Sequence, residues 1–301
     1  MPKVLRIIVI VGGAVLAFVV LGMVGVWFMG GRAFDRAYAL PTESLAIPTD
    51  SASLAEGERQ ATLLGCTDCH GANLAGSMFI DALPFVSLPA PNLTTGDGGV
   101  GAAFSAADFE HAIRHGIDRH GQALMIMPSY EYNRFADDDI GRLIAFLQAA
   151  PPVNNALPPR TVGFIGRMIA GVAPGGLLPA ARIDQTEPHP ATVQRAATAE
   201  YGAYLARPCA GCHGPDFAGA RVPGTGPEVP PASNLTPDTV TGLGTWSEAD
   251  FTRALREGIR PDGSYLNAAM PSRAYALFTD DEVQAVWLFL RSLESVEARE
   301  Y

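Results

Sequence analysis

Cys66-Thr67-Asp68-Cys69-His70 has the pattern Cys-x-x-Cys-His, and the same pattern returns in Cys209-Ala210-Gly211-Cys212-His213. This pattern is typical of covalent c-type haem attachment. Two thiols on one turn of helix can each form a thioether with a vinyl group of the same porphyrin, and the adjacent imidazole can then bind the iron. The chain has four cysteines, and all lie in these motifs. The sequence therefore predicts two covalently bound haem c groups, attached through Cys66, Cys69, Cys209 and Cys212.

Other uses of the cysteines explain less. A zinc site built from all four thiolates is possible in principle, but it would leave both motif histidines without a role. A dithiol redox pair is expected beside a β-α-β unit, and the sequence around both motifs lacks that pattern. Haem attachment accounts for the histidines as well as the thiols.

Each motif histidine is followed, 57 residues later, by the tripeptide Met-Pro-Ser. Proline fixes its own φ and donates no hydrogen bond, so it suits an extended strap that presses a thioether against the iron. Histidine and methionine together raise the reduction potential of a haem and occupy both of its axial positions. We therefore predict the axial pairs His70 with Met127 and His213 with Met270.

Met270 is the only methionine after the second motif, whereas Met127 has competitors in the first half. The repeat register favours Met127, because Ala268 stands in the second half where the first half has Met125. The histidines of the first half align with charged residues of the second, which predicts surface or loop positions for them. The competitors are Met78, Met125, His111, His115 and His120. A histidine in place of Met127 would lower the potential of the first haem and favour a two-haem peroxidase.

The two halves align at a shift of 142 or 143 residues, which indicates an internal duplication. Each half begins with a short predicted helix that leads into the haem motif, over 54–64 in the first and 196–205 in the second. After the motif, Pro91-Asn92-Leu93-Thr94 matches Ser233-Asn234-Leu235-Thr236.

A second helix is predicted in each half. It begins at Ser105 or Ser247, which can cap free N–H groups together with an aspartate three residues later. It ends at Gly116 or Gly258, because glycine readily adopts the left-handed conformation that closes a helix.

The last helix of each half has apolar residues at the spacing i, i+3, i+4 and i+7. In the second half it begins with a capping box from Thr279 to Glu282. In the first half Ala136 occupies the cap position, and we expect Asp137 to take that role. The apolar positions are predicted to pack in the core: Ile140, Leu143, Ile144 and Leu147, and Val283, Val286, Trp287 and Leu290.

Residues 7–30 have no charged side chain and can cross a hydrocarbon core of about 30 Å at about 1.5 Å per residue. Lys3 and Arg6 favour a cytoplasmic N-terminus, and Arg32 and Arg36 weaken this bias. A cleaved signal has an apolar core of only about 7–15 residues, so we predict an uncleaved anchor. Both interpretations export the rest of the chain, in agreement with haem attachment outside the cytoplasmic membrane of bacteria.

The chain is acidic, with a formal net charge of −10. This charge argues against nucleic-acid binding, for which a basic patch is expected. An acidic surface could favour a basic redox partner, but the charge by itself favours general solubility as the explanation.

Composition divides the chain into five parts. The tether after the apolar segment contains Pro41 and Pro48 and has no periodic apolar pattern. The linker between the halves is rich in proline and glycine. Its apolar run, 161–180, is predicted to cover the seam between the haem domains or, as the alternative, to lie against the membrane surface. The predicted parts are an anchor helix 1–32, a tether 33–52, a haem domain 53–150, a linker 151–192 and a haem domain 193–301.

The second half also contains the motifs Asn234-Leu235-Thr236-Pro237-Asp238, Thr241 to Ser247, Asp250-Phe251, Leu255 to Gly258, Asp262-Gly263 and Ala269-Met270-Pro271. Through these motifs, residues 53–301 resemble the multihaem class I cytochrome c family, and above all the membrane-associated cytochrome c subunits of bacterial quinoprotein alcohol, aldehyde and gluconate dehydrogenases. The resemblance implies an all-α fold of tandem class I cytochrome c domains, and the uncharged segment 7–30 predicts one transmembrane helix before them. Those subunits typically have three haem domains and a cleaved signal, so the two haem domains and the long apolar segment of this chain leave the partner open.

Together these features predict a membrane-anchored dihaem electron carrier, or an electron-transfer subunit of an oxidoreductase complex, on the periplasmic side of the inner membrane. It is expected to take electrons from a dehydrogenase or quinol-oxidising complex. The acceptor would be a terminal oxidase, a soluble cytochrome or a reaction centre. The alternatives are a dihaem peroxidase-like enzyme with one open iron and a chiefly structural subunit.

Overall fold

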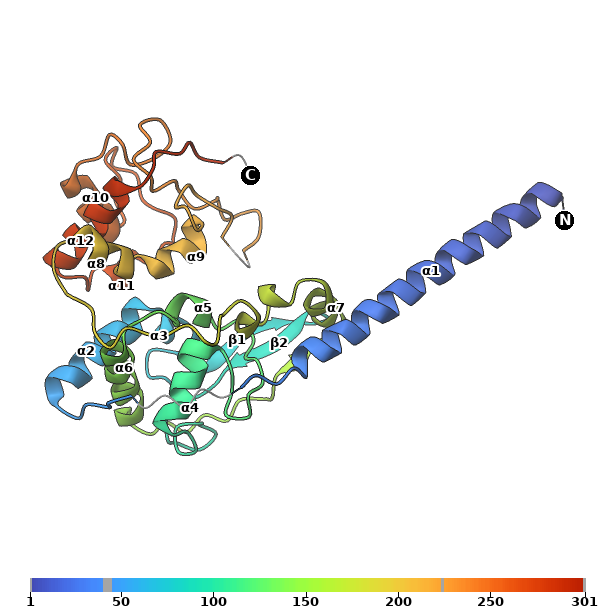
Figure 1. Ribbon diagram of the computed structural model, residues 1–301, viewed down its shortest axis with the longest axis horizontal. Coiled ribbons are helices and arrows are strands. Elements are labelled where there is room, and N and C mark those ends of the chain that lie inside the picture. Colours follow the sequence, from blue (N-terminus) through green and yellow to red (C-terminus); the bar gives the residue numbers. More distant parts are fainter. Residues whose placement is uncertain (1, 40–44, 223–224, 300–301) are drawn as a thin grey trace. The chain divides into compact units, whose positions relative to one another are not determined.

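The computed structural model describes residues 2–39, 45–222 and 225–299 (Figure 1). Pro41 of the predicted tether lies outside the described residues. The chain folds into two compact units, each made of three segments. Unit 1 comprises Met1–Ser44, Cys69–Asn133 and Ala150–Glu187. Unit 2 comprises Leu45–Asp68, Arg134–Ala149 and Pro188–Tyr301.

Helices are the main regular secondary structure of the described residues. The elements of unit 1 are α1 (Lys3–Phe34), β1 (Ser77–Ala82), β2 (Val86–Ala90), α4 (Ala106–Glu110), the π-helix η1 (His111–His115), α5 (Ser129–Tyr132), β3 (Thr161–Val162), α7 (Phe164–Val172), and the 3-10 turns η2 (Pro174–Gly176) and η3 (Pro179–Ala181). Those of unit 2 are α2 (Ser51–Leu63), α6 (Asp137–Ala149), α8 (Ala199–Leu205), η4 (Arg207–Cys209), α9 (Ala210–His213), α10 (Glu248–Glu257), α11 (Ser272–Tyr275) and α12 (Asp280–Ser292). The first haem motif forms α3 (Cys66–His70).

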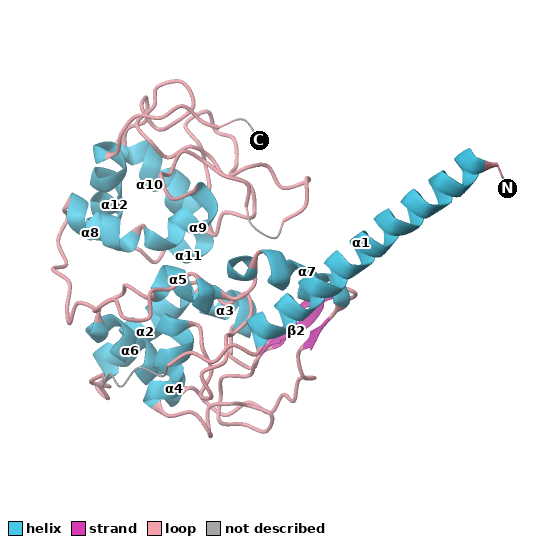
Figure 2. Ribbon diagram, turned by 45° about the vertical axis from the view of Figure 1, so that its right-hand side comes forward, coloured by secondary structure: helices cyan, strands magenta, loops and turns pink. Residues whose placement is uncertain are grey.

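Unit 1 contains a small antiparallel sheet in the order β1-β2-β3, which the all-α prediction omits (Figure 2). Val86, Leu88 and Ala90 of β2 are buried and alternate with half-buried residues, as expected for a strand with one face on the core. The third strand is only two residues long and comes from the interdomain linker. The linker therefore contributes a strand to the sheet of unit 1.

α1 runs away from the rest of unit 1 over most of its length, and its last turns pack beside α7 (Figure 1). By length and composition it could cross a membrane, a test that a signal sequence near the N-terminus also passes. The apolar core of unit 1 is formed by β2, α7 and the segments around η1, η2 and η3. Its buried members are Val86, Leu88, Ile117, Ala123, Met125, Ala170, Leu177, Leu178 and Ala180.

Unit 2 is built on two close helix pairs, α2 with α6 and α8 with α12. The predicted apolar positions of both last helices are buried: Ile140, Leu143, Ile144, Leu147, Val283, Val286, Trp287 and Leu290. The positions at i, i+3, i+4 and i+7 thus face the core in both halves, as predicted.

The predicted helix starts are confirmed where the cap is a serine or threonine. Ser105, Ser247 and Thr279 each form a capping box with the acidic residue three positions later. Gly116 and Gly258 close the second helices at φ values of 63° and 72°. In the first half, η1 extends α4 as a π-helix up to Gly116.

The prediction that Asp137 caps α6 is wrong by one position, because Asp137 is the first helical residue. The missing cap is replaced by distant groups. The Ala136 N–H donates to the Tyr204 hydroxyl at 2.9 Å, and the Asp137 N–H donates to the Pro190 carbonyl at 2.9 Å. Both acceptors lie far along the chain, so local sequence could not reveal them.

Candidate haem-binding sites

The second haem motif lines a cavity of about 490 Å³ in unit 2. Cys209, Cys212, His213 and Met270 all face it. Much of the remaining wall is apolar, with Leu235, Trp246, Phe251 and Leu255. The volume falls within the range of about 300–1,000 Å³ typical of ligand and cofactor pockets. Two thiols, an imidazole and a thioether around one apolar cavity are the groups that a haem c requires.

His213 is held in one tautomer by a backbone carbonyl. Its Nδ1 lies 2.7 Å from the Ser233 carbonyl oxygen, which can only accept a hydrogen bond. Burial lowers the pKa of His213, although this hydrogen bond opposes the effect. A neutral imidazole that donates through Nδ1 leaves the lone pair of Nε2 available for a metal.

His70 of the first motif has the same arrangement. Its Nδ1 lies 2.8 Å from the Pro91 carbonyl oxygen, and burial lowers its pKa against the effect of this bond. Pro91 and Ser233 stand first in the two matched tetrapeptides. The sequence showed that these tetrapeptides correspond, and the structure adds that their first carbonyls orient the motif histidines.

The asparagine and threonine of the second tetrapeptide anchor the loop that carries the Ser233 carbonyl. The buried Asn234 side chain accepts a hydrogen bond from the Thr236 N–H at 2.9 Å and donates to the Val296 carbonyl at 2.7 Å. The Thr236 hydroxyl donates to the same carbonyl at 2.9 Å. A segment near the C-terminus thereby stabilises the loop beside the motif histidine.

The first half repeats these bonds with different residues. The buried Asn92 side chain accepts from the Thr94 N–H at 2.9 Å and donates to the Val153 carbonyl at 2.7 Å. Sequence reasoning did not assign these asparagines a role. The available signal was a polar asparagine retained at the same position of both copies.

The Met-Pro-Ser straps also share one backbone conformation. Pro128 has φ −81° and ψ 46°, and Pro271 has φ −81° and ψ 54°. In both straps the serine N–H donates to the methionine carbonyl, at 2.8 Å from Ser129 to Met127 and 2.9 Å from Ser272 to Met270. The two methionines are therefore presented in the same way.

The rival methionines occupy other environments. Met125 is 6% exposed and belongs to the apolar core of unit 1. Met78 lies on β1 with an exposed side chain. Met125 therefore has a packing role in the core of unit 1.

The prediction of surface or loop positions fits exposed His120 but is wrong for His111 and His115, which are buried. Their register partners in the second half are charged, and charge suggested exposure. Instead, buried Glu110 approaches His115, with Oε1 3.3 Å from Nε2, and the Gln185 side chain lies 2.8 Å from its Nδ1. His115 therefore lies in a polar cluster inside unit 1.

Among the residues that the structure describes, no group of three or more His, Cys, Asp or Glu side chains has an arrangement that could hold a metal ion.

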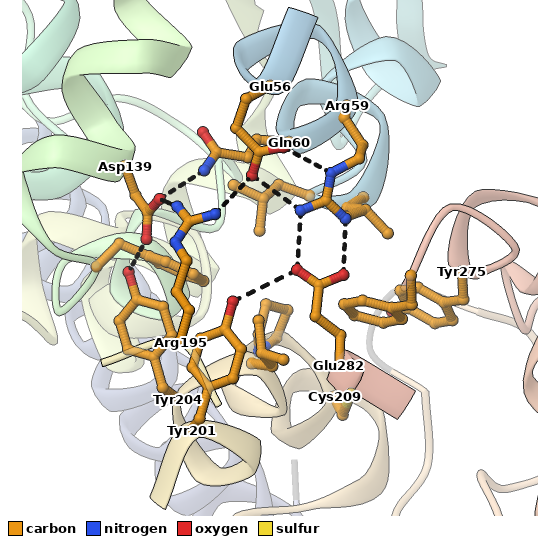
Figure 3. Close-up of a pocket in the computed structure, with 16 residues that line it drawn as sticks. Glu56, Arg59, Gln60, Asp139, Arg195, Tyr201, Tyr204, Cys209, Tyr275 and Glu282 are labelled. Carbon is orange, nitrogen blue, oxygen red and sulfur yellow. Dashed lines mark hydrogen bonds and ion pairs between the residues drawn. The ribbon is translucent and has the colours of Figure 1, made fainter. Parts of the chain in front are cut away.

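A second, smaller cavity of about 50 Å³ in unit 2 shares Cys209 and Tyr275 with the haem-sized cavity (Figure 3). The Arg59 guanidinium lines this cavity and lies between the Glu56 and Glu282 carboxylates. Its nitrogens lie 2.8 Å from Glu56 oxygens and 2.8 Å from Glu282 oxygens. The hydrogen bond with Glu56 is the largest of the effects that raise the pKa of Arg59, against the opposing effect of burial.

Arg195 extends this network to α6. It contacts Glu56 at 3.0 Å and forms a short contact with Asp139. The Tyr204 hydroxyl donates to the other Asp139 oxygen at 2.6 Å. Burial and the neighbouring Asp139 charge both raise the pKa of Tyr204, so this phenol stays a hydrogen-bond donor.

Comparison with known proteins agrees with this geometry. The cytochrome c family model matches residues 54–151 and 199–294. The chain is 37% identical over 94 residues to the gluconate 2-dehydrogenase cytochrome c subunit of Pantoea cypripedii, covering 29% of this chain and 21% of that protein. It is 35% identical over 116 residues to the fructose dehydrogenase cytochrome subunit of Gluconobacter japonicus, covering 36% and 24%. The chain thus spans a quarter or less of these relatives.

A diheme cytochrome c-type protein of Cereibacter sphaeroides is similar over nearly the whole chain. It is 26% identical over 311 residues, which covers 92% of this chain and 95% of that protein. The predicted resemblance to cytochrome c subunits of dehydrogenases is confirmed. Cytochrome c domains carry covalently bound haem c, and two matched domains fit two haems. The family model matches more than half of the residues of this chain, and each of the two matched segments contains a Cys-x-x-Cys-His motif. The chain therefore belongs to the cytochrome c family.

Proposed function

We propose that this chain is a membrane-anchored dihaem electron carrier with no substrate chemistry of its own. Its relatives are cytochrome subunits of gluconate, fructose and alcohol dehydrogenases, which supports a redox partner within a complex. The donor would be a dehydrogenase or a quinol-oxidising complex. The acceptor would be a terminal oxidase, a soluble cytochrome or a reaction centre on the periplasmic side.

The proposed site residues are those of the two motifs and straps. Cys66, Cys69, Cys209 and Cys212 form the thioethers. The axial ligands are His70 with Met127 and His213 with Met270. The proposed haem domains remain 53–150 and 193–301, with the linker 151–192 between them.

The observation that carries the proposal is the matched presentation of histidine and methionine in both halves. Each imidazole donates through Nδ1 to a carbonyl and keeps Nε2 for iron, and each methionine sits on the same type of proline strap. When bound, haem c exchanges single electrons, and two protein ligands leave it no open position. The hydrogen bonds at Nδ1 fix the orientation of both imidazoles, which suits electron transfer with little rearrangement.

Substitution of the proposed methionines tests this assignment on the purified holoprotein. Wild-type protein, reduced with dithionite, is expected to bind no carbon monoxide. Met127→Ala and Met270→Ala are each expected to bind one equivalent, because each opens one iron, and each should lower the potential of one haem. Met125→Leu is the matched control and should bind none, with both potentials unchanged.

Two results would contradict the proposal. Carbon monoxide binding to one haem of the wild type would indicate an open iron and favour the peroxidase-like alternative. Binding in Met125→Leu but not in Met127→Ala would move the ligand to Met125.

A further inference from the structure

We propose that α7 and the tip of the β1–β2 hairpin form a foot that lies on the lipid bilayer beside α1. This interfacial foot comprises Leu83, Phe164, Ile165 and Val172. This inference depends on the proposed membrane anchor, and it concerns a different part of the chain from the haem sites.

α7 is packed closely against the end of α1. A Cβ on Gly30 would lie 2.0 Å from the Arg167 carbonyl oxygen, and a Cβ on Gly171 would lie 2.3 Å from the Val26 carbonyl oxygen. Glycine at both positions therefore lets the two backbones touch. The rings of Trp27 and Phe164 stack with their centroids 5.6 Å apart. The position of α7 is thus set by the last turns of α1.

The contact with α1 places α7 at the level of a membrane surface. About 20 residues at about 1.5 Å each cross a hydrocarbon core of about 30 Å. A span that starts at Ile7 therefore ends near Val26. α7 meets α1 between Val26 and Gly31, where an inserted α1 would leave the hydrocarbon.

The outer face of α7 is apolar and uncovered in the chain itself. Phe164 is 47% exposed, Ile165 44% and Val172 69%. Arg167 is the only charged residue among the nine of α7. A helix of this composition has no polar side for water, and an apolar surface next to a membrane span is best buried in the lipid interface.

The hairpin tip continues the same surface. The Ile165 N–H donates to the Pro84 carbonyl at 3.0 Å, and the Gly163 N–H donates to the Phe85 carbonyl at 2.9 Å. These bonds tie the start of α7 to the turn after Leu83, which is 59% exposed. Two segments far apart in sequence are thereby joined, and both have exposed apolar side chains. Figure 2 shows α7 beside the strands of this hairpin.

The charges and rings around the foot suit lipid headgroups. Arg36 lies over Tyr38, Arg160 over Phe34 and Arg167 over Trp27, at 4.7, 5.8 and 4.3 Å from the ring centroids. Arginine beside aromatic rings is typical of membrane–water boundaries, where the guanidinium reaches the headgroup phosphates. Asp35 and Asp81 are the exposed acids of these segments. The whole chain has a formal net charge of −10. These arginines give the surface around the foot positive charge instead, which complements anionic lipid.

Spin-label accessibility of the full-length holoprotein tests the foot. Single cysteines replace Leu83 and Val172 in the foot, Phe18 in α1 as a lipid reference, and Ala107 on α4 as an aqueous reference in the same unit. Each labelled protein is placed in nanodiscs of phosphatidylcholine and phosphatidylglycerol. The ratio of oxygen to nickel-chelate accessibility at 83 and 172 is expected to be several-fold above that at 107 and close to that at 18.

The outcomes separate the foot from the anchor. Ratios at 83 and 172 equal to that at 107, with a lipid value at 18, would overturn the foot and leave the anchor intact. Low accessibility to both reagents at 83 and 172 would show a covering protein and would also overturn it. A water value at 18, or a purified protein that lacks residues 1–30, would remove the anchor and the foot with it.

A charge inside the foot supplies a second measurement. Val172→Glu is expected to move the label at 83 towards the aqueous value, with unchanged haem absorption as the check of folding. Ala107→Glu is the matched control and should leave that label unchanged. An unchanged label at 83 in Val172→Glu would contradict a shared lipid contact.

Discussion

At the scale of single residues, the two halves agree in the groups that orient the haem ligands. Each motif histidine donates a hydrogen bond to the carbonyl of the residue just before an Asn-x-Thr segment. The buried asparagine of each segment donates to a carbonyl about 60 residues later in the chain. Nδ1 donation selects the tautomer whose Nε2 can bind iron. The duplicated feature is thus a short hydrogen-bond chain in addition to the pentapeptide.

Asn234→Ala tests this chain of bonds. The substitution leaves the Val296 carbonyl and the Thr236 N–H without their bonds to the amide, and we expect a loss of about 1–3 kcal/mol in the free energy of unfolding. Asn92→Ala should cost a similar amount. Urea unfolding followed by circular dichroism measures both. Asn154→Ala, at an exposed position, is the control. An equal loss in the free energy of unfolding in this variant would contradict the role of buried Asn92 and Asn234.

Glu131 on α5 makes stability depend on pH. Burial raises the pKa of Glu131 to about 7, against opposing effects of Tyr130 and Arg182. Between about pH 4.5 and 7 the folded state keeps a proton that the unfolded chain has released, so the stability contributed by this group falls as pH rises through that range. Glu131→Gln should therefore be more stable at pH 8, by at most about 3 kcal/mol, with the difference shrinking towards pH 4.5.

Urea midpoints across this pH range measure the effect. Glu58→Gln, at an exposed position on α2, should leave the pH dependence unchanged. A Glu131→Gln protein with the wild-type pH dependence would show that Glu131 is ionised in the folded state.

At the scale of elements, each half packs its first helix against its last through a glycine. A Cβ on Gly57 of α2 would lie 2.1 Å from the Arg142 carbonyl oxygen of α6, and a Cβ on Gly202 of α8 would lie 1.9 Å from the Ala285 carbonyl oxygen of α12. The close helix pairs thus depend on the absence of a side chain at one position each. Periodicity predicts the helices and their buried faces, but it contains no information on how near two backbones come.

Gly57→Ala and Gly202→Ala should therefore destabilise the protein although alanine favours helices. Overpacking of a close contact typically costs about 1–3 kcal/mol, more than the gain of about 1 kcal/mol in helix propensity. Thermal unfolding measures the balance. Gly176→Ala is the control, because a Cβ there meets no described atom within 4 Å. If Gly57→Ala and Gly202→Ala lower the unfolding midpoint no more than Gly176→Ala does, the close helix contact is contradicted.

At the scale of the whole molecule, the compact units cut across the sequence repeat. α2 and α6 come from the first copy, yet they belong to unit 2 with α8 and α12. Arg59 and Arg195 bind carboxylates from both copies there (Figure 3). Charged residues, which the sequence analysis considered only for their contribution to the net charge, therefore join helices of the two copies.

Glu282→Gln tests this connection while keeping a side chain that can cap α12. Loss of one partner of a buried ion pair costs about 3–5 kcal/mol, and we expect about 2 kcal/mol here because Arg59 is partly exposed. Hydrogen exchange should show faster opening of both α2 and α12. Asp280→Asn in the same helix breaks an ion pair with Arg256 in which Asp280 is 93% exposed, and it should cost at most about 1 kcal/mol.

The sequence by itself determined the cofactor chemistry, the duplication, the helix starts at Ser105, Ser247 and Thr279, and the buried faces of the last helices. These features depend on residues within a few positions of one another, so local spacing contains them. The tertiary structure alone decided the sheet, the burial of His111 and His115, the replacement of the α6 cap and the joining of α2 and α6 to the second copy. Each of these depends on a partner far along the chain, and the stabilising contact exists only once folding has brought the two together.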